Sequence, residues 1–189
     1  MKNAFTESLS LLKEVQKDDA LLQNIQDAAD MMIYALQAGH KILWCGNGGS
    51  AADCQHLSAE LVARLNDQRR ALASLALTTD TSFLTAWMND TNNSDHLFSR
   101  QIKALALPGD VLIAISTSGN SQNIVEALRA ARDNKAKCMV LSGNRGGKLK
   151  GMSDIELIVP SDNTQRIQEI HIIIGHMICE EVEKAFISP

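Results

Sequence analysis

The first part of the chain carries apolar residues at three- and four-residue steps, which is the spacing of an amphipathic helix. The acidic pair Asp18-Asp19 interrupts this pattern, and Gly39 ends it. The pattern predicts two helices over residues 3–38, arranged as a helical hairpin. Their apolar faces fit subunit packing as well as an ordinary core, and we expect residues 1–38 to serve oligomerisation.

After Lys41 the pattern changes to short apolar runs bounded by turn residues. Runs that are apolar on both faces are typical of strands in a parallel sheet. They occupy residues 41–45, 72–77, 110–116, 137–142 and 155–160. Helical stretches lie after Ser50, around 82–88, and at 121–134 and 162–186. This alternation predicts one α/β domain over residues 1–189, with a five-stranded parallel sheet flanked by helices.

Composition and charge narrow the range of functions. Eighteen Lys and Arg against 22 Asp and Glu leave a net charge of −4, and aromatic residues make up only 4% of the chain. Nucleic-acid binding needs a basic surface or aromatic stacking, so neither value favours it. No apolar stretch reaches the roughly 20 residues of a membrane span, and the N-terminus lacks a signal-peptide pattern. We therefore expect a cytoplasmic protein without nucleic-acid or membrane partners.

A glycine-rich loop, Gly46-Asn47-Gly48-Gly49-Ser50, joins the first predicted strand to a helix. Glycines let the backbone approach a ligand, and free N–H groups at a helix start suit an anion. A tight turn is the simplest alternative. The loop also matches the dinucleotide pattern G-x-G-x-x-A, but the acidic residue expected about 20 positions later would fall before the second strand. A Walker loop is excluded because no Gly-Lys-Ser/Thr follows.

A second loop, Ser116-Thr117-Ser118-Gly119-Asn120-Ser121, follows the third predicted strand. Ser121 is well placed to cap the next helix, but a cap needs one hydroxyl and the segment carries four. Such a set suits a phosphate held by neutral donors. Ligands of open parallel sheets bind at the carboxyl ends of the strands, so both loops should face the same site. Together the two loops predict a phosphosugar site.

Three segments resemble the signature segments of sugar isomerase (SIS) domains. They lie at 46–53, 116–121 and 166–171 and read GNGGSAAD, STSGNS and RIQEIH. Within this family the chain resembles the bacterial phosphoheptose isomerases over nearly its whole length. The resemblance implies conversion of sedoheptulose 7-phosphate to D-glycero-D-manno-heptose 7-phosphate for lipopolysaccharide or a related surface heptose. It also implies a homotetramer with one zinc ion per active site.

The resemblance also assigns the chemistry, with Glu60 as catalytic base and His176 as catalytic acid. Moving a proton between C1 and C2 through an enediolate needs a carboxylate at carbon and a second group at the oxygens. The zinc ligands that the resemblance implies are His56, Glu60, Gln168 and His176. The residues expected to contact the substrate are Asn47, Gly48, Gly49, Ser50, Glu60, Asn89, Asp90, Ser116, Thr117, Ser118, Ser121 and Gln168.

Residue spacing bears on the metal site. His56 and Glu60 lie four residues apart, so both project from one face of a helix. Gln168 and His176 lie eight apart, which on a helix is about 12 Å of rise and roughly 80° of rotation. Zinc bonds are about 2 Å long. One helix cannot easily bring both side chains to one ion, so we expect His176 to enter the site from a neighbouring subunit, with the active sites at subunit interfaces.

The segment after Asn89-Asp90 departs from the family pattern. The family usually continues with an aromatic and glycine segment before Phe98, whereas residues 91–97 of this chain read TNNSDHL. This difference leaves an isomerase of another phosphosugar as one alternative, and Asn89-Asp90 could also form a helix-ending turn. A second alternative is a binding protein of the DnaA initiator-associating type, which keeps the fold and both loops. Such proteins lack the Glu and the late His that this chain carries at 60 and 176.

Overall fold

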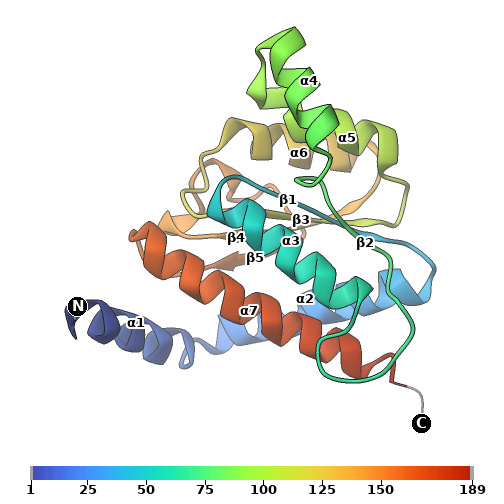
Figure 1. Cartoon of the computed structure of the whole chain (residues 1–189). Coiled ribbons are helices and arrows are strands. Elements are labelled where there is room, and N and C mark those ends of the chain that lie inside the picture. Colours follow the sequence, from blue (N-terminus) through green and yellow to red (C-terminus); the bar gives the residue numbers. More distant parts are fainter. Residues whose placement is uncertain (1, 188–189) are drawn as a thin grey trace.

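The fold is organised around a parallel sheet of five strands. The computed structural model describes residues 2–187, and Figure 1 shows the sheet between two layers of helices. The strands are β1 (Ile42–Gly46), β2 (Ser74–Ala76), β3 (Val111–Ser116), β4 (Lys137–Ser142) and β5 (Ile155–Ile158). Their order across the sheet is β2-β1-β3-β4-β5, and every neighbouring pair is parallel. The predicted five-stranded parallel sheet is confirmed.

Helices connect the strands in sequence. They are α1 (Lys2–Val15), α2 (Asp19–Gln37), α3 (Gly49–Val62), α4 (Thr81–Thr91), α5 (Leu97–Leu105), α6 (Gln122–Asp133) and α7 (Thr164–Lys184), with short 3₁₀ segments η1 (Ser94–His96) and η2 (Asn144–Leu149). The predicted break at 18–19 is confirmed, because Asp18 caps α2 by accepting the N–H of Leu21. The patterns did not indicate α5. None of the described helices is long and apolar enough to span a membrane.

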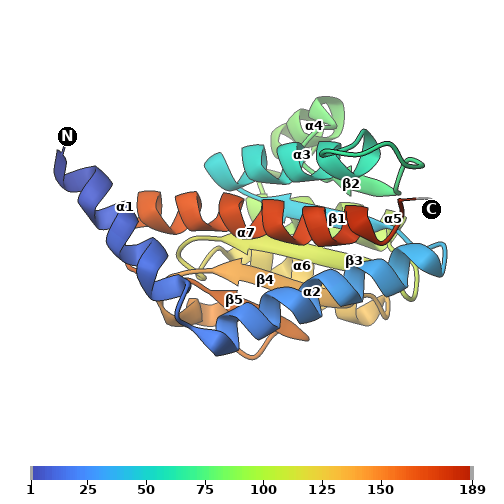
Figure 2. The ribbon, with the colours of Figure 1, turned by 90° about the horizontal axis from the view of Figure 1, so that it is seen from below.

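Alternate residues of each strand face opposite helical layers, as the pleat requires. In β1, Ile42 and Trp44 belong to the core cluster that includes residues of α1, α2, α3 and α7, whereas Leu43 and Cys45 belong to the cluster on the face covered by α5 and α6. Figure 2 shows α2 and α7 along the first face, with α1 diverging from α2. Arg166 ties α1 to the first turn of α7 by donating to the Ala4 carbonyl at 2.8 Å. The two predicted N-terminal helices are present and each contacts α7, but they diverge from one another and do not pack as the predicted hairpin.

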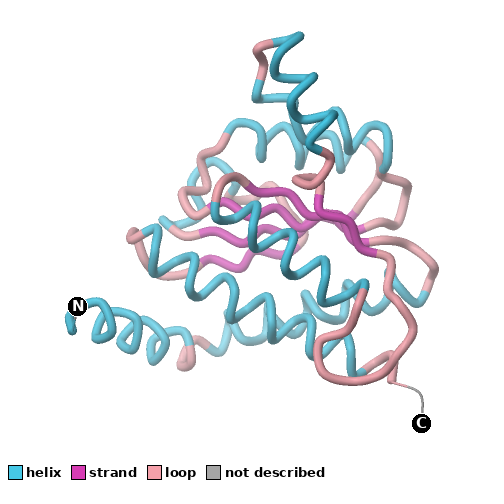
Figure 3. The backbone as a smooth tube through the Cα atoms, viewed as in Figure 1, coloured by secondary structure: helices cyan, strands magenta, loops and turns pink. Residues whose placement is uncertain are grey.

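The order of the strands changes direction between β1 and β3: the chain passes from β1 outward to β2 and then returns to the other side of β1 to form β3. β1 pairs with β2 on one side and with β3 on the other. The helix after β1, α3, lies on one face of the sheet, and the helix after β3, α6, lies on the opposite face. The loops at the carboxyl ends of these strands thus leave in different directions (Figure 3). In open α/β sheets this is the position at which ligands bind.

His171 is a buried histidine in the middle of α7. It is fully buried, and neither ring nitrogen forms a hydrogen bond with any residue that the structure describes. The hydroxyl of Ser142, at the end of β4, is also buried and has no hydrogen-bond partner within residues 2–187. Burial lowers the pKa of His171 to about 4, and the nearby Ser142 backbone opposes this shift only in part. The ring is therefore neutral at pH 7 and belongs to the core.

Replacing His171 with Leu should remove one source of acid sensitivity. Between about pH 6.5 and 4 the unfolded chain binds a proton at His171 and the folded chain does not, so the folded state loses stability as the pH falls through this range. The loss should be about 3 kcal/mol at most. Urea unfolding at pH 7 and pH 4 checks this, because the carboxylates titrate alike in both proteins. Equal losses in wild type and variant would contradict the prediction.

Candidate active site

The two predicted loops lie side by side at the carboxyl ends of neighbouring strands. Gly46 at the end of β1 is in register with Ile115 near the end of β3. A reciprocal pair of hydrogen bonds then joins the two segments. The amide of Asn47 donates to Asn123 at 2.9 Å, and the amide of Asn123 donates back at 2.9 Å. The two loops therefore lie at the same edge of the sheet, as expected, with Asn47 bonded to the first turn of α6, and their binding of one ligand stays a prediction.

The first loop presents the start of α3. Gly48 is the N-cap residue, with φ at 55°, a conformation that favours glycine. No side chain caps the helix there. The N–H groups of the first turn therefore have no side-chain acceptor, and they carry the positive end of the helix dipole. This arrangement suits an anion such as phosphate.

The second loop gathers hydroxyl groups. Ser116 Oγ lies 3.2 Å from Ser121 Oγ, and Ser118 Oγ accepts the N–H of Asn120 at 3.2 Å. Ser121 is the N-cap residue of α6, as predicted, but its hydroxyl makes no capping hydrogen bond. The O–H of Ser118, one O–H of the Ser116–Ser121 pair and the first N–H groups of α6 therefore remain available to a ligand.

The segment around η2 holds the second loop in place. Thr117 accepts the N–H of Gly143 on its carbonyl at 3.1 Å, and Gly119 accepts that of Leu149 at 3.1 Å. Gly119 has φ at 64°, and a Cβ there would collide with the carbonyl of Gly146. Only glycine fits this position, so the shape of the loop is fixed by the chain that follows β4.

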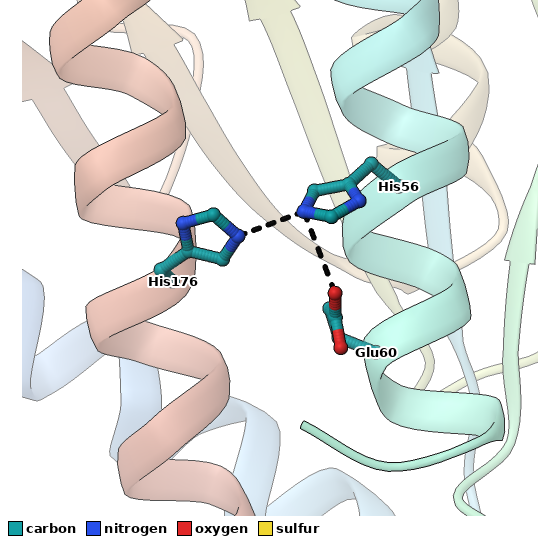
Figure 4. Close-up of side chains that lie close together, drawn as sticks. All are labelled: His56, Glu60 and His176. Carbon is teal, nitrogen blue, oxygen red and sulfur yellow. Dashed lines mark hydrogen bonds and ion pairs between the residues drawn. The ribbon is translucent and has the colours of Figure 1, made fainter. Parts of the chain in front are cut away.

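Three titratable side chains form a cluster beside the loops. His56 and Glu60 come from α3 and His176 comes from α7 (Figure 4). His56 Nε2 lies 2.7 Å from His176 Nε2 and 3.4 Å from Glu60 Oε1. One ligand atom of each residue lies within 4.8 Å of the other two. His56 is exposed and the other two are half-buried, so a ligand can reach all three.

Close packing of α3 and α7 brings this cluster together. The two helices cover the same face of the sheet and run in the same direction, side by side (Figure 2). At Gly175 an added Cβ would collide with Leu57 on α3. The missing side chain lets α7 approach α3 closely, next to His56 and His176.

The expectation that His176 enters from a neighbouring subunit is wrong. His176 meets His56 and Glu60 of its own chain, because α7 lies alongside α3. The spacing argument separated Gln168 from His176 along α7, but it placed the wrong one of the two away from His56 and Glu60. Gln168 lies beside an earlier turn of α3, where its Nε2 donates to Asp53 Oδ2 at 3.3 Å. A role for Gln168 as a metal ligand stays a prediction.

Asp53 is a site residue to which sequence analysis gave no role. It is half-buried between Gln168 and His56. Burial raises the pKa of Asp53, although the Gln168 hydrogen bond and the charge of His56 oppose the shift. Asp53 precedes His56 by three residues and Glu60 by seven, so all three share one face of α3. The spacing of three and seven residues from His56 and Glu60 could have indicated Asp53 as a site residue from the sequence.

Asn89 and Asp90 lie apart from the cluster within the described chain. They occupy the exposed last turn of α4 and hydrogen bond to each other at 3.0 Å. α4 buries none of its residues and projects beyond the layer formed by α5 and α6 (Figure 1). A contact between these two residues and the substrate stays a prediction.

The donor set of the cluster fits a zinc ion. Two imidazole nitrogens and one carboxylate oxygen are a common ligand set in catalytic zinc sites, which keep a further position for water or substrate. His56, Glu60 and His176 supply this set from two helices, with their donor atoms already close together. These three residues would hold the ion.

Comparisons with known proteins identify relatives over nearly the whole chain. A family model described as SIS domain matches residues 5–143. The chain is 46% identical over 187 residues to the phosphoheptose isomerase of Shewanella sp. (strain W3-18-1). The alignment covers 97% of this chain and 93% of that protein. It is 51% identical over 172 residues to the phosphoheptose isomerase of Helicobacter hepaticus, and this alignment covers 91% of this chain and 87% of that protein.

Solved structures of such enzymes share the fold. Phosphoheptose isomerase GmhA from Neisseria gonorrhoeae superposes with a TM-score of 0.88 at 44% identity, covering 97% of this chain and 96% of that one. A phosphoheptose isomerase from Francisella tularensis gives 0.92 at 36% identity, with the same coverage of both chains. The chain therefore belongs to the SIS-domain family and, within it, to the phosphoheptose isomerases, which are aldose–ketose isomerases.

Proposed function

We propose that this enzyme converts sedoheptulose 7-phosphate to D-glycero-D-manno-heptose 7-phosphate, in the synthesis of lipopolysaccharide core or a related surface glycan. The cluster of His56, Glu60 and His176 beside two loops of neutral donors carries this proposal. The loops suit the phosphate, and the cluster suits proton transfer at the other end of the sugar. The relatives named phosphoheptose isomerase support heptose as the sugar.

The side chains divide the proton transfers between carbon and oxygen. Glu60 removes a proton from C1 of the ketose and returns it to C2, by way of an enediolate. His176 gives a proton to the oxygen on C2 and takes one from the hydroxyl on C1, so the number of protons is unchanged. Zinc held by His56, Glu60 and His176, with Gln168 as a further predicted ligand, would polarise these oxygens as a Lewis acid.

The alternatives differ in their support. Residues 91–97 form the end of α4, the short segment η1 and the start of α5, and their departure from the family pattern keeps another phosphosugar as an alternative substrate. The alternative of a non-enzymatic binding protein has less support. Glu60 and His176 lie together with His56, as a catalytic role requires.

We infer that the enzyme is a homo-oligomer and expect a tetramer in the cytoplasm. Apolar side chains remain exposed on α1 and α7, with Leu9 at 58%, Ile173 at 38% and Met177 at 39% exposure. α4 projects from the fold without a buried residue. Packing against further copies would cover both surfaces, and it would give Asn89 and Asp90 a route to a substrate held by another copy.

Replacing Glu60 with Gln should lower the turnover of sedoheptulose 7-phosphate about 10²- to 10⁴-fold, because the amide cannot accept the proton from carbon. A chelator should also lower the turnover of the wild type. Glu180→Gln, an exposed change one helical turn after His176, serves as the control and should stay active. Full activity of E60Q would show that Glu60 is not the catalytic base. Turnover of other ketose phosphates, but not of sedoheptulose 7-phosphate, would show that the proposed substrate is wrong.

Replacing His56 with Ala should lower the zinc content of the purified protein. The variant loses one of three clustered donors, but it should stay folded because His56 is exposed. Metal analysis and circular dichroism of the same sample measure both properties. His96→Ala removes an exposed histidine outside the cluster and should leave the zinc content unchanged. Full zinc in H56A would show that His56 is not a ligand.

Replacing Ser118 and Ser121 with Ala should mainly weaken substrate binding. Each lost hydrogen bond should cost about 0.5–1.5 kcal/mol, and more where it reaches the charged phosphate. The dissociation constant of the substrate, measured by calorimetry, checks this. Ser153→Ala is the control, since this hydroxyl donates to the carbonyl of Ile155 at the start of β5, at the end of the strands opposite the two loops. Unchanged affinity in the double variant would place the phosphate elsewhere.

A further inference from the structure

A buried ion pair lies beyond the cluster, between the segment after α3 and the last turns of α7. Arg69 Nε lies 3.3 Å from Glu183 Oε1, and the two side chains are 0% and 2% exposed. Neither residue belongs to the candidate site. A buried ion pair is costly unless further hydrogen bonds satisfy both groups. The additional partners of Arg69 and Glu183 therefore indicate what the pair holds in place.

Arg69 holds the end of α3 that carries Glu60. Its Nη2 donates to the Glu60 carbonyl at 2.6 Å, and its Nη1 donates to the Leu61 carbonyl at 2.9 Å. The last carbonyls of a helix have no partner within it and carry the negative end of the helix dipole, which a cation stabilises. The backbone of the proposed catalytic base is thus anchored directly by Arg69.

Glu183 holds the chain that follows α3. Its oxygens accept the N–H groups of Leu65 at 2.8 Å, Asn66 at 2.6 Å and Asp67 at 3.1 Å. Burial alone would raise the pKa of Glu183, but these three donors and Arg69 lower it below its usual value. Glu183 follows His176 by seven residues, which is two helical turns, so both lie on the same face of α7.

We propose that Arg69 and Glu183 are positioning residues that fix α3 against α7 and thereby set the distance of Glu60 and His56 from His176. This inference rests on the proposed function. Gly175 sets the approach of the helices beside the cluster, and the ion pair fixes them further along. A displacement of about 1 Å of a catalytic group can lower a rate about 10²-fold.

The arrangement requires an arginine. The guanidinium is planar and rigid, so its two Nη atoms donate to carbonyls of α3 while its Nε lies at ion-pair distance from the Glu183 carboxylate. A lysine ammonium at position 69 would keep the charge on a flexible stem, without this fixed geometry. Arg69→Lys therefore separates the positioning role from the charge.

Asp110 offers a matched control. Its carboxylate is 1% exposed, pairs with Lys41 and accepts the backbone N–H groups of Lys41 and Leu107. Glu183 is likewise buried, paired with a cation and bonded to backbone N–H groups. Asp110 directly precedes β3, at the amino ends of the strands, whereas the site lies at their carboxyl ends. Asp110→Asn should therefore lower stability without moving the cluster.

The test compares Glu183→Gln, Arg69→Lys and Asp110→Asn by urea unfolding, zinc titration and steady-state kinetics. E183Q and R69K should bind zinc roughly 10- to 100-fold more weakly, the usual effect of losing a group that orients metal ligands. Their kcat for sedoheptulose 7-phosphate should fall about 10²-fold. Their KM should change little, because the loops that hold the phosphate are intact. D110N should lose stability but keep wild-type zinc affinity and kcat.

Wild-type zinc affinity and kcat in folded E183Q and R69K would overturn the positioning role. Losses of the same size in D110N would also overturn it, because lowered stability alone would then explain them. If E183Q does not fold, R69K, which keeps the charge, decides the question. A fully active E60Q would instead contradict the proposed function, and the zinc affinities would still report on the positioning of the cluster.

Discussion

The close approach of α3 and α7 is the constraint on which the site depends. Packed helix axes ordinarily lie roughly 8–10 Å apart, at a distance set by the side chains between them. Here Leu57 packs where Gly175 has no side chain, so the neighbouring residues His56 and His176 come within 2.7 Å. Both helices also pack against the sheet. The cluster is therefore held by the core and does not depend on a mobile loop.

Features determined by neighbours in sequence could be predicted. Continuous apolar runs indicated β1, β3 and β4 as strands buried on both faces, and parallel pairing then placed the loops after β1 and β3 at one edge. The spacing of His56 and Glu60 placed both on one helix face. The helix α5 was not predicted, because the apolar residues that it buries, Phe98 and Ile102, span little more than one turn.

Contacts between distant elements could not be predicted in the same way. The rise along α7 separates Gln168 from His176, but it does not tell which of them faces His56. Assigning His176 to another subunit assumed that Gln168 marks the centre of the site, and the packing of α7 on α3 places His176 there instead. The pair of Arg69 and Glu183 joins segments far apart in sequence, and neither residue lies in a recognisable motif.

The chemistry of the two loops has a kinetic consequence. Residues 46–50 and 116–121 contain no Lys or Arg, so a phosphate bound there as proposed would meet the dipoles of hydroxyl and N–H groups. Dipole fields decay faster than those of charges, and the net charge of −4 gives an anion no long-range attraction. Association of substrate would then proceed by diffusion without electrostatic steering and would respond little to ionic strength. Substrate and product carry the same phosphate, so the absence of long-range attraction would apply equally to both.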